Sequence, residues 1–263
     1  FFPAVLGVGA GKRLGKRVVL TYHGGGAERF FRKHNGLVRH FLLKTDVNIV
    51  LSGFLGRVFD EHGLPYTVIP NIIELDETQF YKRKTLTPKY ICTRAHEELY
   101  NIPCILRAYG IVKAEMPDAT LTLVGDGSQH TALMQMAEDM GLEDVTFTGR
   151  VDNNMIYDYL NNADILVSSP TVDNMPVSLL EAMNAGLLII SSRVGGVPYM
   201  IEDGRTGLLF DDNDSATLAK LMLQTVRQLD ESMGMIDRAR HEVAAYRWEN
   251  VRNKIYSAYG ISA

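Results

Sequence analysis

The sequence is short of cysteine, of long apolar runs and of any strong excess of one charge. Its two cysteines, Cys92 in an expected strand and Cys104 in an expected helix, are too few for a disulfide framework, so we expect two buried thiols in a reducing cytosol. No run of about 18 apolar residues occurs, which argues against a membrane-spanning helix. The formal net charge of −4 at pH 7 gives no reason to expect nucleic acid as a main partner. No set of His, Cys, Asp and Glu residues has metal-ligand spacing, so no metal site is expected.

The first residues also lack the features of a leader. The chain begins without a methionine, and its opening apolar residues, Phe1 to Leu6, are too few for a secretory signal. A basic cluster at Lys12, Arg13, Lys16 and Arg17 follows these residues instead of preceding them. We therefore expect residues 1–17 to be the cut edge of a larger domain, with processing as the open alternative.

What is present is enough apolar material for one or two cores, since 46% of the 263 residues are apolar. Val18 to Tyr22 is a β-branched run that ends in the glycine loop His23-Gly24-Gly25-Gly26. A helix over 28–44, a strand over 47–51, a helix over 53–62 and a strand over 66–70 are expected to follow. The helix over 28–44 is basic and amphipathic, with Gly36 interrupting it. Two alternatives stay open for it: peripheral contact with anionic lipid, or a solvated face over a packed one.

The segment 81–88 is polar and basic without an apolar period, and it is predicted to be a linker. After it, apolar runs and amphipathic segments alternate at a spacing that predicts a parallel, doubly wound sheet. The expected strands are 89–93, 119–124, 144–148, 165–168 and 187–190, and the expected helices are 97–115, 129–141, 153–162, 176–186, 214–230, 233–246 and 248–259.

The stretch from Ala163 to Phe210 contains the densest pattern. A strand is followed by a polar loop that ends in Asp173 and Asn174, then by a helix opened by Pro176, and then by a second strand closed by a Gly-Gly turn. In open α/β sheets, ligands bind outside the carboxyl ends of the strands, where helix N-termini present N–H groups.

This stretch resembles the signature region of retaining glycosyltransferases of family 4, which have the GT-B fold. In that family an acidic residue, seven other residues and a glutamate are followed by EAM, a short strand and GG-x-P. The matching residues here are Asp173, Glu181-Ala182-Met183, 187–191 and Gly195-Gly196-Val197-Pro198. Further landmarks follow the family order, namely Tyr22-His23-Gly24-Gly25, Ser52-Gly53-Phe54, Ile69-Pro70-Asn71 and Thr148-Gly149-Arg150-Val151, so the resemblance covers about Gly15 to the C-terminus.

The resemblance implies a GT-B-like α/β fold: two Rossmann-type, doubly wound parallel-sheet domains facing a cleft, the first of them incomplete. We expect a partial acceptor-side domain over 1–84, a nucleotide-sugar-binding domain over 85–246, and a helix over 247–263 that crosses back to the first domain. An incomplete first sheet would expose an edge or an apolar face. We expect Phe1, Phe2, Val5 and Leu6 to help cover it, or a second copy of the chain to do so in a homo-oligomer.

The implied activity is retaining transfer of a hexosyl group from a nucleoside diphosphate sugar, a UDP- or GDP-sugar, to a sugar, lipid or small-molecule acceptor. It needs no metal or other cofactor, and its expected place is the cytoplasm or the inner face of the membrane. Such transfer must stabilise a diphosphate leaving group while positive charge grows at the anomeric carbon. Two alternatives stay open: a nucleotide-sugar-binding module with little or no turnover, and a sugar-nucleotide epimerase of the same fold.

The resemblance also assigns site residues. Arg94 matches the phosphate-binding arginine, whose guanidinium can hold phosphate oxygens bidentately, and the alternative is a surface arginine paired with Glu97 or Glu98. Glu181 matches the carboxylate that accepts hydrogen bonds from the ribose hydroxyls, and the alternative is a solvated glutamate on the polar side of its helix. Asp173 and His23 match the catalytic groups that face the sugar, with a loop-capping aspartate and a structural histidine as the alternatives. The remaining donor-binding residues are expected to be Asn174, Met175, Val177, Ser178, Gly125, Arg150 and Val151.

Several positions depart from the family pattern. Leu99 stands where a lysine is usual, so one cation for the diphosphate is missing, although a variant pattern with a Tyr-Asn pair, here Tyr100-Asn101, occurs in the family. Lys89 or an acceptor-side group is an alternative cation. Asp173 is one methylene shorter than the usual glutamate, and Tyr199 replaces a common glutamate. Gly125-Asp126-Gly127 lacks the three-glycine spacing of a dinucleotide fingerprint, so a turn is expected there.

Overall fold

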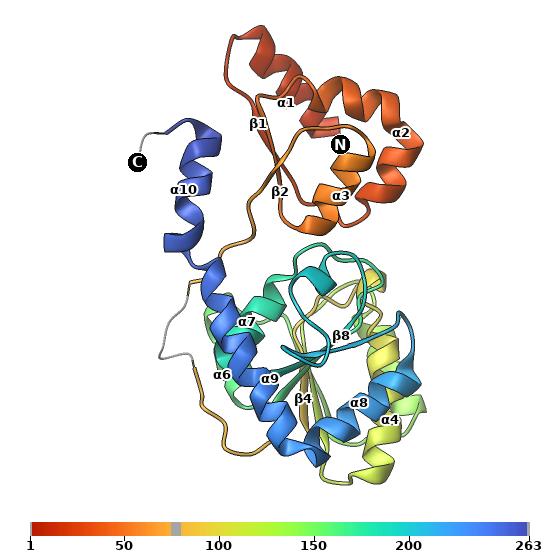
Figure 1. Cartoon of the computed structure of the whole chain (residues 1–263). Coiled ribbons are helices and arrows are strands. Elements are labelled where there is room, and N and C mark those ends of the chain that lie inside the picture. The colour runs from red at the N-terminus through yellow and green to blue at the C-terminus, as the bar shows by residue number, and fades with distance from the viewer. Residues whose placement is uncertain (1, 75–79, 262–263) are drawn as a thin grey trace. The chain divides into compact units, whose positions relative to one another are not determined.

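The computed structural model describes residues 2–74 and 80–261. The chain divides into two compact units, each built around its own parallel sheet (Figure 1). The first unit holds the residues up to 72 together with 173–175 and those from 245 on, and the second holds 73–172 and 176–244. None of the described helices is both long and apolar enough to cross a bilayer.

The first unit contains a three-stranded sheet of order β1-β2-β3. Its strands are β1 (Val19–Tyr22), β2 (Val47–Val50) and β3 (Thr67–Val68), and each neighbouring pair is parallel, with Val19 opposite Val47 and Ile49 opposite Thr67. Helix α2 (Ala27–Leu42) connects β1 to β2, and α3 (Gly53–Glu61) connects β2 to β3. Ser52 caps α3, since its hydroxyl accepts from the backbone N–H of Leu55.

The two faces of this sheet are covered by segments that are far apart in the sequence. Helices α2 and α3 pack on one face, with Phe31, Val38 and Phe59 among the buried residues. Helix α10 (Trp248–Tyr259) packs on the other face, where Val251 and Ala258 meet Ile49, Ile69 and their neighbours. Alternate residues of a strand point to opposite faces, which is why Val50 joins one cluster and Ile49 the other.

The apolar side of α2 is used in this core. Ala27, Phe31, Val38 and Leu42 are buried, whereas the basic residues of the helix lie mainly at its exposed side. This arrangement agrees with the second alternative for this helix, in which one side packs in the core and the opposite, basic side is solvated. The interruption expected at Gly36 is a kink two residues earlier, at His34, where φ is −125° and ψ is 31°.

Helix α1 (Phe2–Arg13) precedes β1 and was not predicted from the sequence. Its Val8 is buried, but Phe2 is 72% exposed and Leu6 is 58% exposed. The prediction that these two residues help cover the first sheet is therefore wrong, because both side chains point largely into solvent. Val5 is half-buried, and Phe1 lies outside the described residues.

The second unit contains a six-stranded parallel sheet of order β6-β5-β4-β7-β8-β9, which confirms the predicted doubly wound sheet. The chain runs outward from β4 to β5 and β6, returns to place β7 beside β4, and runs outward again to β8 and β9. The order therefore switches direction between β4 and β7. The strands are β4 (Lys89–Cys92), β5 (Thr120–Val124), β6 (Val145–Gly149), β7 (Ile165–Ser168), β8 (Leu188–Ser192) and β9 (Leu208–Phe210), of which β9 was not predicted.

Helices cover both faces of the second sheet (Figure 1). One layer holds α4 (Ile102–Glu115), α5 (His130–Asp139) and α8 (Ser215–Arg227), and the other holds α6 (Ile156–Asn161) and α7 (Val177–Ala185). Helix α9 (Leu229–Glu242) adds Met235 and Ile236 to the core on the α4 side and also bonds to α7, where Arg240 donates to the carbonyl of Asn184 at 2.9 Å. Short 3₁₀ segments lie at η2 (Glu98–Tyr100), η3 (Asn153–Met155), η4 (Val197–Tyr199) and η5 (Val243–Tyr246). Cys92 and Cys104 are buried free thiols, and burial raises the pKa of Cys92 to about 12 and that of Cys104 to about 11.

The segment predicted to be a linker is anchored to the second unit. The side chain of Arg83 is 1% exposed and its Nε lies 3.0 Å from a carboxylate oxygen of Asp164. Its guanidinium also donates to the carbonyl oxygens of Leu160 (2.9 Å), Ala185 (2.7 Å) and Gly186 (3.0 Å). Burial lowers the pKa of Arg83, and Asp164 opposes that shift. The segment 81–88 lies within the second unit, where the basic side chain of Arg83 satisfies carbonyls at helix ends.

Candidate functional site

The carboxyl ends of the central strands gather polar side chains at the point where the strand order switches. Thr93 and Arg94 follow β4, Ser168 ends β7, and Ser191 lies near the end of β8. The hydroxyls of Thr93, Ser168 and Ser191 are buried and have no hydrogen-bond partner within 2–74 and 80–261. Buried hydroxyls without a protein partner are uncommon, and these three lie at the edge where open α/β sheets bind ligands. These hydroxyls were not predicted, although the serines that end the runs ILVSS and LIISS are a visible signal in the sequence.

Arg94 occupies a defined position at this edge. One of its terminal nitrogens donates to the hydroxyl of Ser178 at 3.0 Å, and its guanidinium carbon lies 4.0 Å from the centre of the Tyr100 ring. Glu97, one proposed partner in the alternative for Arg94, accepts instead from the N–H (2.9 Å) and hydroxyl (2.6 Å) of Ser128, and these hydrogen bonds lower its pKa. The Ser178 hydroxyl and the Tyr100 ring thus hold the guanidinium at the sheet edge.

Helix α7 carries the second charged group of the site, the carboxylate of Glu181, near Arg94. Pro176 precedes the helix, and the first backbone amides of a helix have no partner within it. Ser178 and Glu181 are three residues apart, so they lie on the same side of the helix. Burial raises the pKa of Glu181, whereas the nearby charge of Arg94 lowers it. The site therefore combines a guanidinium and helix amides, which bind anions, with a carboxylate that can accept hydrogen bonds from hydroxyls.

The segment that carries Tyr100 is tied to the loop after β7. The hydroxyl of Ser169 donates to the carbonyls of Tyr100 (3.0 Å) and Asn101 (2.8 Å), and the N–H of Thr171 donates to the carbonyl of Leu99 at 2.8 Å. These bonds fix the ring that stacks on Arg94. The Leu99 side chain is 40% exposed. Tyr100 was expected only as part of a variant family pattern, and its contact with Arg94 was not predicted because this contact depends on tertiary structure.

Gly125 packs directly on the backbone of Arg94. Its φ is +146°, and a Cβ at this position would lie 2.4 Å from the carbonyl oxygen of Arg94. Only glycine fits such a close approach. The N–H of Gly125 also donates to the carbonyl of Gly149 at 3.1 Å, which places the start of the turn with Arg150 (exposed) and Val151 (half-buried) beside Gly125.

Asp173, Asn174 and Met175 belong to the first unit by their contacts. A carboxylate oxygen of Asp173 accepts from the N–H of Asn174 at 2.7 Å, so a loop-capping bond is present. Asn174 is buried and its side-chain oxygen accepts from the hydroxyl of Ser52. The carbonyl of Met175 accepts from the side-chain amide of Asn71 at 2.8 Å. Two of the predicted donor-binding residues therefore hold the loop to other predicted landmarks, while Val177 is 42% exposed at the start of α7.

His23 is exposed at the end of β1 in the first unit. It lines a cavity of about 350 Å³ together with Ala4, Leu20, Tyr22, Phe30 and neighbours. Arg94, Ser178, Glu181 and Gly125 come together in the second unit, whereas Asp173, Asn174, Met175 and His23 are placed by the first. Within the described part of the chain, no group of three or more His, Cys, Asp and Glu side chains could hold a metal ion.

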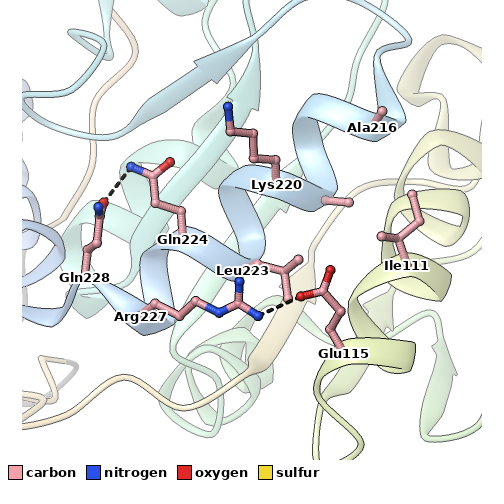
Figure 2. Close-up of a pocket in the computed structure, with 9 residues that line it drawn as sticks. Ile111, Glu115, Ala216, Lys220, Leu223, Gln224, Arg227 and Gln228 are labelled. Atoms are coloured by element: carbon pink, nitrogen blue, oxygen red, sulfur yellow. Dashed lines mark hydrogen bonds and ion pairs between the residues drawn. The ribbon is translucent and has the colours of Figure 1, made fainter.

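A larger cavity, of about 610 Å³, lies between α4 and α8. Figure 2 shows that Arg227 and Glu115 approach each other across it, and their ion pair measures 2.7 Å. Gln224 and Gln228 are joined along α8 by a second hydrogen bond of 2.6 Å. None of the predicted site residues lines this cavity, so it supplies control positions for tests of the site.

The fold defines an α/β protein with two parallel-sheet units, and the second unit gathers Arg94, Ser178 and Glu181 at the point where its strand order switches. The family model described as "Glycosyl transferases group 1" matches residues 88–228, just over half of the 263 residues, and the chain belongs to this family. A second model, "Glycosyltransferase Family 4", matches residues 1–77.

Curated relatives carry related names. The chain is 29% identical over 239 residues to N-acetyl-alpha-D-glucosaminyl L-malate synthase of Bacillus anthracis. This match covers 86% of this chain and 61% of the relative. It is 26% identical over 160 residues to a GDP-mannose-dependent phosphatidylinositol monomannoside mannosyltransferase of Mycobacterium tuberculosis, covering 57% of this chain and 42% of the relative. The match thus spans 61% or less of the length of these two relatives.

Solved structures agree on the fold. HepE of Anabaena in complex with UDP-glucose matches with a TM-score of 0.83 at 18% identity, over 98% of this chain and 76% of that one. Sucrose-phosphate synthase of Thermosynechococcus elongatus matches with a TM-score of 0.83 at 19% identity, over 96% and 70%. At such identities the likeness shows the fold alone, and it confirms the predicted GT-B-like α/β class.

Proposed function

We propose that this chain binds a nucleoside diphosphate sugar and transfers its glycosyl group with retention of the anomeric configuration. The observation that carries the proposal is the cluster of Arg94, Ser178 and Glu181 at the switch point of the second sheet. Family membership and the names of the relatives support the same class of reaction.

Arg94 and the first amides of α7 hold the diphosphate in this proposal. When the bond between the anomeric carbon and the phosphate oxygen breaks, the leaving diphosphate gains negative charge. A guanidinium already fixed by Ser178 and Tyr100 stabilises that charge without further ordering. Hydrogen bonds in which a partner is charged are roughly twice as strong as neutral ones.

Glu181 accepts the ribose hydroxyls. This role requires the ionised carboxylate, and the charge of Arg94 favours that form against the effect of burial. Gly125, Arg150 and Val151 form the turn near the base, and UDP and GDP are the proposed nucleotides. Asn174 and Met175 support the loop before α7, and Val177 and Ser178 supply its first turn.

Asp173 and His23 face the donor sugar in the proposed complex. Their carboxylate and imidazole are suited to orient a hexosyl group and to stabilise positive charge at the anomeric carbon. We propose a sugar, lipid or small-molecule acceptor and a reaction that needs no metal. The homo-oligomer, the membrane contact and the cytoplasmic setting stay predictions of the sequence.

A thermal-shift panel of UDP, GDP and their hexose conjugates, followed by product analysis, tests the proposal. We expect one nucleotide to raise the melting temperature, and Arg94→Ala to abolish that rise. Arg227→Ala, which changes an arginine in the cavity of Figure 2, is the matched control and should retain it.

The same experiment separates the alternatives. Binding without sugar release favours a module without turnover, and interconversion of the free donor without an acceptor favours an epimerase. If no nucleotide raises the melting temperature of the unmodified chain, the proposal is wrong.

A further inference from the structure

Two histidines face each other in the second unit beside the loop that carries Arg94. His96 follows β4 and is fully buried, and His130 opens α5 with 23% of its side chain exposed. Their Nδ1 atoms lie 2.8 Å apart, and their rings stack with centres 4.8 Å apart and planes 12° apart. Phe147 of β6 presents its ring edge-on to both imidazoles.

The backbone of His96 joins two loops at the same place. Its N–H donates to the carbonyl of Asp126 (3.0 Å), and its carbonyl accepts from the N–H of Gln129 (2.9 Å). A Cβ on Gly127 would lie 2.5 Å from the His96 carbonyl oxygen, and one on Gly125 would lie 2.4 Å from that of Arg94. The turn after β5 therefore touches the loop after β4 at two points, at the backbone of Arg94 through Gly125 and at the backbone of His96 through Gly127.

The 2.8 Å between the two Nδ1 atoms leaves room for one proton between them, so two neutral imidazoles carry two ring N–H protons in a defined arrangement. One Nδ1 must donate and the other accept, so the contact holds one proton, and a second proton lies on the Nε2 of the accepting ring. The Nε2 of His96 is buried and has no hydrogen-bond partner among the described residues. The arrangement that avoids a buried, unpaired N–H has His96 donating and the more exposed His130 carrying the second proton.

A third proton cannot be added without cost. The contact has room for one proton only, so both Nε2 atoms would then be protonated. That change places an unpaired N–H and a positive charge at the buried His96 ring. The uncharged pair avoids this cost, because the buried Nε2 of His96 then carries no proton, whereas protonation of the pair puts an unpaired N–H at that buried atom.

We propose that His96 is a positioning residue: the uncharged His96–His130 pair holds the loop that carries Arg94 against the turn after β5, and protonation of the pair releases it. The consequence for ligand binding rests on the proposed function of Arg94 as the diphosphate cation. The class of ligand affected is a nucleoside diphosphate.

The charged surroundings agree with this direction. Burial lowers the pKa of His96, the charge of His130 lowers it further, and Asp126 opposes these effects. The Asp126 carboxylate lies 3.8 Å from His130 Nδ1, Glu97 of the same loop is bonded to Ser128, and β6 contributes the uncharged Phe147 ring. Because the folded protein binds this proton less readily than the unfolded chain, stability decreases as pH falls below about 6.5.

The test compares His130→Asn with the unmodified chain between pH 7.5 and 5.5. An asparagine amide can replace the Nδ1 contact but does not titrate. The dissociation constant of UDP or GDP should rise by a few-fold, and by less than about tenfold, more in the unmodified chain than in this variant, because a lowered pKa of His96 makes the pair harder to protonate at pH 5.5 than an ordinary imidazole. The titration of the ligand's own phosphate is common to both proteins and cancels.

His241→Asn, at an exposed residue of α9, is the matched control and should keep the pH profile of the unmodified chain. A second readout does not need the ligand: the melting temperature should fall less on acidification in His130→Asn, and by NMR the ring signals of His96 in the unmodified chain should titrate below the ordinary pKa of histidine. If a nucleotide binds and all three proteins share one pH profile in both readouts, the proposal is overturned. If no nucleotide binds but melting and NMR behave as expected, the pair stands and the proposed function fails.

Discussion

In the second unit, Arg94 and Glu181 come from neighbouring elements at the centre of a six-stranded sheet, whereas in the first unit His23 follows the edge strand β1 of a three-stranded sheet. Arg94 is held by Ser178 and Tyr100, and Glu181 is half-buried and close enough for the charge of Arg94 to lower its pKa. His23 is exposed at a glycine loop. The comparison teaches that the proposed recognition of the nucleotide is built on fixed groups, while the proposed contact with the sugar comes from a less anchored part of the chain. Substitutions should therefore be able to remove nucleotide binding and sugar transfer separately.

The largest effect is expected from breaking the core of the first unit. Phe59 is fully buried and its ring packs against Phe31, with ring centres 5.3 Å apart. Phe59→Ala should cost about 3–5 kcal/mol of the free energy of unfolding. Trp248 is the single tryptophan and lies on α10 in the first unit, so its fluorescence reports the unfolding of that unit. The fluorescence transition should move to lower denaturant concentration, while UDP or GDP binding persists.

Leu106→Ala is the reverse control for this prediction. Leu106 is buried in α4 of the second unit. This variant should lower the stability of the second unit by about 2–5 kcal/mol and lose nucleotide binding first. Loss of nucleotide binding in Phe59→Ala, under conditions where the circular dichroism of the chain is native, would contradict the proposed independence.

The next largest effect concerns the cation itself. Arg94→Ala should weaken binding of the bare nucleoside diphosphate by about 1.5–3 kcal/mol, or roughly tenfold to a hundredfold, because a charge-assisted hydrogen bond is lost. Arg94→Lys should recover only part of this, since an ammonium cannot form the bidentate contact. Calorimetry with UDP and GDP measures the effect. Equal affinities in all three proteins would show that Arg94 does not touch the diphosphate.

The two carboxylates sharpen the comparison further. Glu181→Gln should weaken binding of the nucleoside diphosphate by roughly tenfold to a hundredfold. Asp173→Asn should leave that binding nearly intact and lower sugar transfer, because the proposed contact is with the sugar and strengthens in the transition state. Turnover assays paired with calorimetry test both. The opposite pattern, with Asp173→Asn alone losing the nucleotide, would reverse the assignment of these residues.

Stability provides the control for Glu181→Gln. Because burial raises the pKa of Glu181, the folded state binds its proton more readily than the unfolded state, and stability falls as pH rises above the ordinary value of 4.5. The glutamine removes this penalty. A loss of nucleotide binding with an unchanged or raised melting temperature at pH 7 therefore marks a lost contact and not an unfolded protein.

A smaller effect is expected at the ring that supports Arg94. Tyr100→Leu removes a cation–π contact that is worth about 0.5–2 kcal/mol, so nucleotide affinity should fall by a few-fold to about thirtyfold. Tyr100→Phe keeps the aromatic face and should bind like the unmodified chain. If the phenylalanine variant loses as much affinity as the leucine variant, the hydroxyl and not the ring face is what matters.

The second sheet and its two charged site residues could be predicted from the sequence, because local patterns determine them. The alternation of apolar runs and helices predicted the second sheet because parallel strands are buried on both sides and short. The run Ile165–Ser168 and the helix after Pro176 coincide with β7 and α7. The order of motifs led to Arg94 and Glu181, and the structure places them close enough for the charge of Arg94 to affect Glu181.

Features that depend on distant parts of the chain were not predictable. His96 and His130 meet only because β4 and β5 pair and both loops leave the same sheet edge. Arg83 is buried because carbonyls at helix ends surround it, and a polar segment without a period gives no sign of that. Strand β9 has three residues, which is too short for a pattern to identify.

The smallest expected effect tests the missing cation. Leu99 is 40% exposed in the segment that Thr171 and Ser169 tie to the loop after β7, so a longer side chain at this position has room in solvent. Leu99→Lys should strengthen binding of the nucleoside diphosphate by about 1 kcal/mol, or roughly fivefold, if the new ammonium reaches the phosphates in a partly desolvated site. Leu99→Met is the control for side-chain length without charge and should leave affinity unchanged. Raising the salt concentration should reduce the gain in the lysine variant, because ions screen an exposed charge pair. If the lysine variant binds no more tightly than the methionine variant at low salt, position 99 does not face the phosphates. The proposed diphosphate contacts are then those of Arg94, which the Tyr100 ring supports, and of the α7 amides.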